Sequence, residues 1–230
     1  TDVLGAEAND EMMEISQRVS PKLSQTSNNI FLNKKLLARV KSIYDKKEQL
    51  NLSTEDAKLL EDLYESFKAN GATLNKDDKE KYRKLSMDLS MLTLQFDQNA
   101  LKDKNRFELL ITDENELSGL PESARDAAAM LAKSKDKNGW LFNLSAPSYI
   151  PFMRYSDKRD LREKMYREYM SVGNKGDEFD NKDIIKKIVN IRLEIAQLMG
   201  FKNYAEYALE HTMAKNSANV YKLLNQFLEA

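Results

Sequence analysis

Apolar residues along most of the chain recur every three or four positions, the spacing that places them on one face of an α-helix. The two clearest runs are Tyr82, Leu85, Leu89, Leu92 and Phe96, and Ile184, Ile188, Ile191, Ile195 and Leu198. Two or three heptads of this kind are more typical of a long helix packed in a bundle than of an intermolecular coil. The pattern predicts a mainly α-helical fold, a bundle-like lobe of helices.

Capping residues and glycines indicate where these helices begin and end. Ser53, Asn75 and Ser156 are each predicted to cap the helix that follows, because their side chains can accept a hydrogen bond from a first-turn N–H group. Gly71 is predicted to stop the helix opened by Ser53, in the left-handed conformation that glycine tolerates best. Only 7 glycines and 4 prolines interrupt 230 residues, which favours helix throughout.

The middle of the chain changes period. Residues 106–111 and 140–144 are short aromatic and aliphatic runs bounded by turn residues, and they predict a small two-stranded β element. A helix is expected between them, after Pro121. These changes divide the chain into residues 1–104, a helical segment, residues 105–155, a hairpin-like insert with one helix, and residues 156–230, a second helical segment.

The segment that carries Pro147 and Pro151 is predicted to be extended, because proline disfavours helix both at its own position and before it. An extended run could offer backbone groups to a peptide. Tyr149, Met153 and Arg154 are then the candidate side chains for lining a site. The alternative is a packed connection between the second strand and the next helix.

Charge and chemistry exclude several functions. With 36 basic and 37 acidic residues the net charge is −1, which gives no general attraction to nucleic acid or an anionic membrane. No apolar run approaches the roughly 18 residues of a membrane span, so neither partner is expected and an RNA-binding role is poorly supported. The absence of cysteine excludes disulfides without fixing the compartment.

The chain contains one histidine, His211, and no cysteine. A zinc site needs about three protein ligands, usually histidine with cysteine or a carboxylate, so we assign no metal ligand and no catalytic residue. His211 is better explained as a surface or capping residue than as a general base. Adjacent carboxylates such as Glu61 and Asp62 are better explained as a solvated helix face.

Several short motifs, in order and spacing, resemble the non-catalytic half of the M3 family of zinc oligopeptidases. They are Phe67-x-x-x-Gly71-Ala72-x-Leu74, Leu92-Thr93-x-x-Phe96-x-x-Asn99, Gly119-Leu120-Pro121, Pro147-x-Tyr149-x-Pro151-x-Met153 and the run from Ile188 to Tyr207. The last is similar to the family's R-x-x-x-A-x-L-L-G-[YF]-x-x-[YH]-A segment. The run from Leu32 to Val40 leans toward the peptidyl-dipeptidase (dipeptidyl carboxypeptidase) branch.

The resemblance implies an internal, inactive fragment of a two-lobed peptidase that removes C-terminal dipeptides from short peptides. The family's H-E-x-x-H motif is not in this sequence, and both ends fall within helical patterns. Residues 1–104 would belong to the N-terminal lobe, and residues 156–230 would lead toward the catalytic region. Tyr149, Met153 and Arg154 would line part of the substrate channel.

The implied partners are short peptides and the remaining catalytic lobe of the same polypeptide. Zinc would be bound in the parent enzyme, with no cofactor in this fragment. A cytoplasmic location is expected, with a periplasmic or exported protein as the alternative. Exo- and endo-cleavage both stay open. A different class of function, a stand-alone helical module that offers a groove to a partner helix, is also compatible with the pattern.

Overall fold

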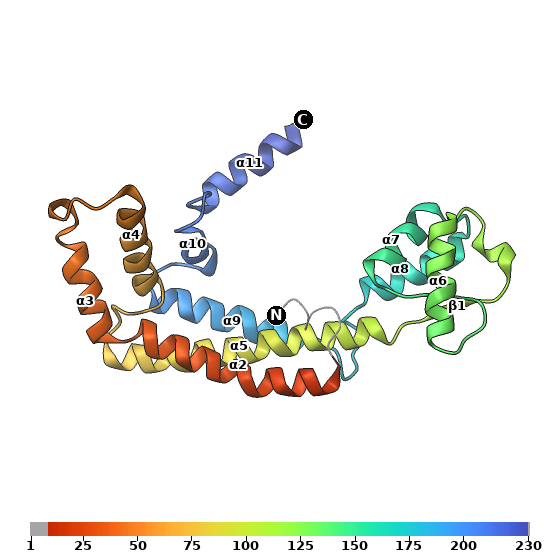
Figure 1. The fold of residues 1–230 in the computed structure, drawn as a ribbon, viewed down its shortest axis with the longest axis horizontal. Helices are drawn as coiled ribbons and strands as arrows, with labels where there is room; N and C mark the ends of the chain where they lie inside the picture. The colour runs from red at the N-terminus through yellow and green to blue at the C-terminus, as the bar shows by residue number, and fades with distance from the viewer. Residues whose placement is uncertain (1–8, 230) are drawn as a thin grey trace. The chain divides into compact units, whose positions relative to one another are not determined.

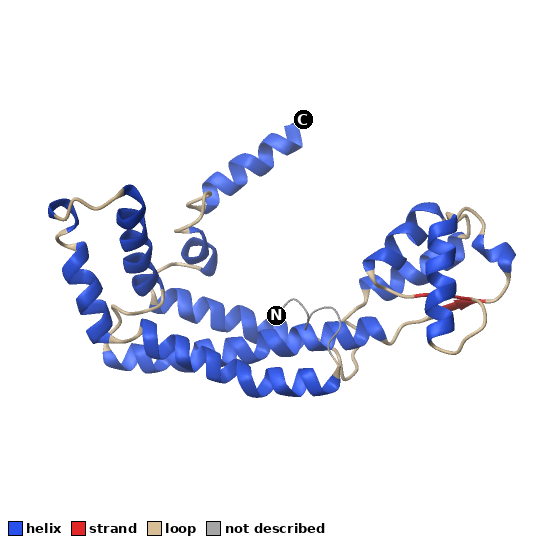
Figure 2. Cartoon of the chain, in the orientation of Figure 1, coloured by secondary structure: helices blue, strands red, loops and turns tan. Residues whose placement is uncertain are grey.

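The computed structural model describes residues 9–229 and confirms a mainly helical fold with a small β element (Figure 1, Figure 2). The α-helices are α2 (Asp10–Phe31), α3 (Lys34–Tyr44), α4 (Thr54–Ala69), α5 (Lys76–Asn105), α6 (Glu122–Ser134), α7 (Ala146–Tyr155), α8 (Arg159–Met170), α9 (Lys182–Leu198), α10 (Tyr204–Leu209) and α11 (Ser217–Glu229). The strands are β1 (Leu109–Ile111) and β2 (Trp140–Phe142), and short 3-10 helices occupy Lys47–Gln49 and Glu114–Leu117.

The described residues form two compact units. One unit contains residues 95–185, and the other contains residues 9–94 together with residues from 186 onward. Helices α5 and α9 therefore contribute residues to both units. The division of the sequence at residues 104 and 155 stays a prediction about its segments.

The unit of residues 95–185 is built around the predicted hairpin. Strands β1 and β2 pair antiparallel, with Leu109 opposite Phe142 and Ile111 opposite Trp140, so both predicted runs are confirmed as strands of three residues each. Helix α6 packs on β2 and α7, and α7 packs on α8. Their buried side chains form one core: Phe107, Leu109, Ile111, Leu117, Leu120, Ala128, Phe142, Leu144, Phe152 and Met165.

The second unit places α2 and α9 alongside α5 (Figure 1). Its core joins Leu32, Tyr82, Leu85 and Ile195, which confirms that the three-four spacing in α5 and α9 marks buried faces. Hydrogen bonds also join α2 to α5: Ser20 and Ser90 are hydrogen-bonded at 2.8 Å, and the Asn28 side chain donates to Ser86 at 2.8 Å.

Two of the predicted caps are confirmed, and so is the glycine stop. The backbone N–H of Asp56 donates to Ser53 Oγ at 3.1 Å, and that of Asp78 donates to Asn75 Oδ1 at 2.9 Å. Gly71 lies just beyond α4 with φ of 81°.

The prediction for Ser156 is wrong. Its N–H donates to the Phe152 carbonyl oxygen at 3.1 Å, and its side chain is buried, so it ends α7. Helix α8 begins only at Arg159, after Lys158. The guanidinium of Arg162 donates to the Ser156 carbonyl oxygen, so Ser156 sits between two helices and caps the end of the first.

The prediction of an extended segment at Pro147 and Pro151 is also wrong, because this stretch is helix α7. Pro147 lies in the first turn, where the missing N–H would have had no helical partner. Pro151 removes one hydrogen bond further in. Burial of Phe152, whose ring meets Phe142 edge-on at a centroid distance of 4.7 Å, offsets that loss, since a fully buried phenylalanine contributes about 1.5–3 kcal/mol.

Candidate functional site

The helical form of α7 decides where the three candidate channel residues lie. Tyr149 and Met153 are four positions apart, so they share one face of the helix. Both are half-buried against the core of residues 95–185. Tyr149 also stacks on Tyr169 of α8, with ring centroids 4.2 Å apart and planes inclined by 16°. Burial, together with Tyr169 and Tyr166 nearby, raises the pKa of Tyr149.

Arg154, the third candidate, is exposed, and its guanidinium lies 5.3 Å from the centroid of the Tyr155 ring. The structure therefore brings Tyr149 and Met153 together as packing residues and leaves Arg154 outward. Of the three, only Arg154 presents a charged group to solvent, and the role of the three residues in a channel stays a prediction.

A buried carboxylate network is the feature that the sequence did not reveal. The side chain of Asp103 is 0% exposed, and it accepts hydrogen bonds from the Gly173 N–H at 2.7 Å and from Lys175 Nζ at 3.1 Å. Arg106 Nε lies 2.7 Å from the same carboxylate. Both cations are shared, since Arg106 also pairs with Asp177 and Lys175 with Glu168. The arrangement ties the loop after α8 to α5, and all three contacts stabilise Asp103 as a structural carboxylate.

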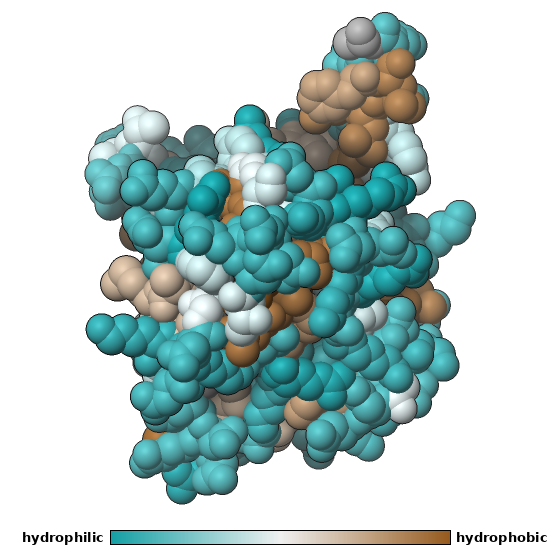
Figure 3. Space-filling model, turned by 90° about the vertical axis from the view of Figure 1, so that its right-hand side faces the viewer, coloured by the Kyte–Doolittle hydropathy of each residue, from teal (hydrophilic) through white to brown (hydrophobic). Residues whose placement is uncertain are grey.

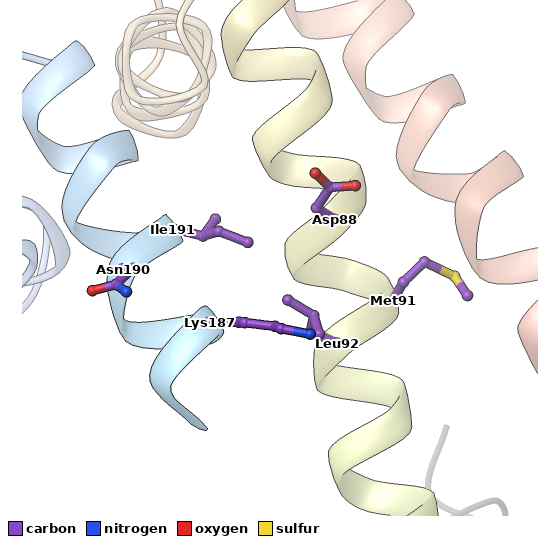
Figure 4. A pocket seen from close by; sticks show the side chains of 6 residues that line it. All are labelled: Asp88, Met91, Leu92, Lys187, Asn190 and Ile191. Atoms are coloured by element: carbon purple, nitrogen blue, oxygen red, sulfur yellow. The ribbon is translucent and has the colours of Figure 1, made fainter. Parts of the chain in front are cut away.

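A hollow between α5 and α9 lies in the second unit and measures about 440 Å³. It is lined by Asp88, Met91, Leu92, Lys187, Asn190 and Ile191. Figure 4 shows Lys187 and Ile191 extending from α9 toward α5. Met91, Leu92 and Ile191 are its apolar lining residues, Asp88 and Lys187 are its charged ones, and the lining includes no nucleophile paired with a base.

A smaller hollow of about 300 Å³ lies in the same unit. It is lined by Tyr82, Ser86, Leu89, Ser90, Ile195, Tyr204 and Tyr207. Burial raises the pKa of Tyr82 and of Tyr207, so both phenols stay neutral. The Tyr207 hydroxyl donates to the Ala69 carbonyl oxygen at 2.8 Å, which ties α10 to the end of α4.

The residues that the structure describes do not fit zinc. Within residues 9–229 no group of three histidine, cysteine, aspartate or glutamate side chains could hold a metal ion. His211 is exposed after the end of α10, with Nε2 3.3 Å from a Glu210 carboxylate oxygen, as expected for a surface histidine. Among residues 9–229, no helix combines the length and the hydrophobicity that a membrane span requires.

Comparison with known proteins relates the chain to peptidases of family M3. Residues 152–230 match the model of that family. The chain is 34% identical to Oligopeptidase A of Salmonella typhimurium, over 93% of its own length and 32% of the relative. It is 35% identical to Probable cytosolic oligopeptidase A of Arabidopsis thaliana, over 89% of the chain and 30% of the relative.

A second type of relative is almost as similar. Dipeptidyl carboxypeptidase of Escherichia coli is 31% identical over 98% of the chain and 33% of that protein. The similarities therefore do not distinguish the peptidyl-dipeptidase branch, which the sequence motifs favoured, from the branch of oligopeptidase A. The chain spans about a third of the length of the curated relatives that it matches.

Proposed function

We propose that this chain, as part of a peptidase of family M3, supplies a non-catalytic helical portion that shapes the route of short peptides to the active site. The observation that carries the proposal is the similarity to Oligopeptidase A over 93% of the chain. The helical fold is compatible with it, and within residues 9–229 no group of histidine, cysteine, aspartate or glutamate side chains could hold a metal ion.

The zinc of such an enzyme makes a bound water nucleophilic near neutral pH. We propose that its ligands lie outside residues 9–229, since these residues offer no set of ligands for it. What these residues contribute is shape and charge. The parent enzyme would exclude folded proteins, admit short peptides and shield the reaction from bulk water when its lobes close. We propose the cytoplasm as its compartment.

Within this portion, α7 is the proposed channel element. Tyr149 and Met153 hold the helix on its core, and Arg154 presents the guanidinium that would meet a peptide carboxylate. In the longer enzyme, Arg154→Ala should raise KM several-fold with little change in kcat, since binding made equally in the ground and transition states affects KM alone. Arg167→Ala, which removes an exposed guanidinium from α8, is the matched control. Equal KM values for the two variants would exclude α7 from the channel.

The proposal as a whole is tested with two purified proteins, the 230-residue chain and the product of the longer reading frame. We expect only the longer protein to cleave short peptides and a chelator to abolish its activity. Mass spectrometry of the products decides the mode of cleavage, since release of C-terminal dipeptides alone indicates a peptidyl-dipeptidase and internal cuts indicate an endopeptidase. Chelator-sensitive hydrolysis by the 230-residue chain alone would contradict the proposal.

The alternative function, a stand-alone helical interaction module, draws support from the exposed apolar side chains of α11, among them Phe227, which is 69% exposed. A reading frame that ends near Ala230, together with a specific complex of this chain in native mass spectrometry, would favour the module over the peptidase.

A further inference from the structure

Helix α11 has an apolar face that nothing in the described chain covers. None of its residues is buried. Tyr221 is 65% exposed, Phe227 69% and Leu228 84%. Figure 3 shows hydrophobic surface gathered at the upper right, where α11 lies. Patches of this kind mark contacts with another segment or protein.

The apolar face is broad and the opposite face is nearly uncharged. Successive residues turn by about 100°, so the apolar positions together span about 160° of the helix circumference. They are Val220, Tyr221, Leu223, Leu224, Phe227 and Leu228. A helix that packs on a protein core typically carries an apolar stripe of about 100° or more. The face of α11 is therefore wide enough to pack against a protein core.

Helix α11 also needs such a partner to be stable. It contains 13 residues, and isolated helices shorter than about 12–15 residues are marginal in water. Hydrogen bonds hold its N-terminal end: the Asn219 N–H donates to Asn216 Oδ1 at 3.0 Å, the Asn219 side-chain amide donates to the Ala214 carbonyl oxygen at 2.8 Å, and the Ser217 hydroxyl donates to Glu206. The rest of the helix, from Tyr221 onward, is exposed along its whole length.

Two other occupants are disfavoured by size and charge. Pairing of α11 with the same helix of a second copy would bury roughly 400 Å², because 13 residues extend only about 20 Å. Stable interfaces bury at least about 1,200 Å². A membrane surface is disfavoured because amphipathic helices that bind it carry many lysines and arginines on the polar face, whereas α11 carries Lys222 alone.

We propose that the apolar face of α11 is enclosed by segments of the same polypeptide that lie outside these 230 residues, each presenting an apolar, uncharged face. This inference rests on the proposed function, since it requires the longer M3-type polypeptide. A segment of the same polypeptide also meets α11 at an effective concentration in the millimolar range. It can therefore cover a face of this size, although the buried area is smaller than two separate proteins need to form a stable complex.

Cysteine labelling tests the proposal, because the chain has no cysteine of its own. Phe227→Cys is introduced into the 230-residue chain and into the longer polypeptide, and the maleimide labelling rate at this position is followed by peptide mass spectrometry. We expect labelling at least about tenfold slower in the longer polypeptide, because a packed side chain reacts only after local opening. Leu224→Cys is a second position in the same face. Gln226→Cys, on the polar face, is the control and should react at similar rates in both proteins.

Equal labelling rates at Phe227→Cys and Leu224→Cys in the two proteins would overturn the proposal. So would protection that depends on the concentration of the 230-residue chain, which indicates a second copy, or protection by anionic vesicles, which indicates a membrane. A reading frame that ends at Ala230 would overturn it as well. A peptidase assay on the same variants of the longer polypeptide separates this inference from the proposed function. An active protein that is labelled fast at the α11 positions refutes this inference alone. An inactive protein that is labelled slowly there refutes the proposed function alone.

Discussion

Replacing Phe152 by alanine should destabilise the unit of residues 95–185 far more than any surface change on the same helix. Phe152 is 0% exposed and meets Phe142 edge-on at 4.7 Å. Truncation of a buried phenylalanine costs about 3–5 kcal/mol, from lost burial and from the cavity left behind. That loss is a large share of the roughly 5–15 kcal/mol that stabilises a domain.

Trp140 provides the assay, because it is the only tryptophan of the chain and packs against the same core as Phe152. Its fluorescence therefore reports urea unfolding of this unit and not of the other. With a urea slope of about 1–3 kcal/mol per molar, the Phe152→Ala midpoint should fall by roughly 1–5 M, with the slope unchanged.

Ile150→Ala is the matched control, on the same helix and 58% exposed. Its midpoint should stay near that of the parent chain, because surface substitutions mostly change stability by less than about 0.5 kcal/mol. Similar midpoints for both variants would refute the assignment of α7 as a helix that anchors itself through Phe152. Such a result would favour the extended conformation that Pro147 and Pro151 predict for this segment.

Three further changes test the ion pairs and the hairpin. Asp103→Asn should cost about 3–5 kcal/mol, since it removes one partner of a buried charge network, and thermal unfolding will show it. Glu108→Gln should lower the urea midpoint above pH 4.5, because hydrogen bonds from Lys135 and Lys137 lower the pKa of Glu108 from 4.5; the difference from the parent chain should vanish as the pH falls through that lowered pKa. Gly139→Ala should disrupt the hairpin, because a Cβ there would collide with the Ile111 carbonyl oxygen and φ is 115°, and the Trp140 signal will report it.

Each of these changes has a control in the same unit. Asp126→Asn and Glu114→Gln alter exposed carboxylates and should leave the midpoint within about 0.5 kcal/mol of the parent. Gly176→Ala carries the strain of a positive φ of 72° without any collision, so it should cost less than Gly139→Ala. An Asp103→Asn variant as stable as Asp126→Asn would contradict the role given to Asp103. A pH-independent effect of Glu108→Gln would contradict the role given to its ion pairs. Equal losses of stability in Gly139→Ala and Gly176→Ala would contradict the collision expected at Gly139.

The sequence by itself determined the helical class, the two strands and the buried faces of α5 and α9. These follow from local rules, since periodicity fixes which side chains share a face and Ser53, Asn75 and Gly71 act on the turns beside them. The pairing of Leu109 with Phe142 was also within reach, because both strands are short, apolar and bounded by turns.

Only the tertiary structure decided the rest. Pro147 and Pro151 locally disfavour helix, yet burial of Phe152 against Phe142 outweighs the one hydrogen bond that is lost. Asp103 meets Lys175 72 positions along the chain, and no spacing rule reaches that far. Whether the apolar side chains of α11 are covered is likewise set by what packs on them, because amphipathic spacing identifies a face and the surrounding structure supplies its partner.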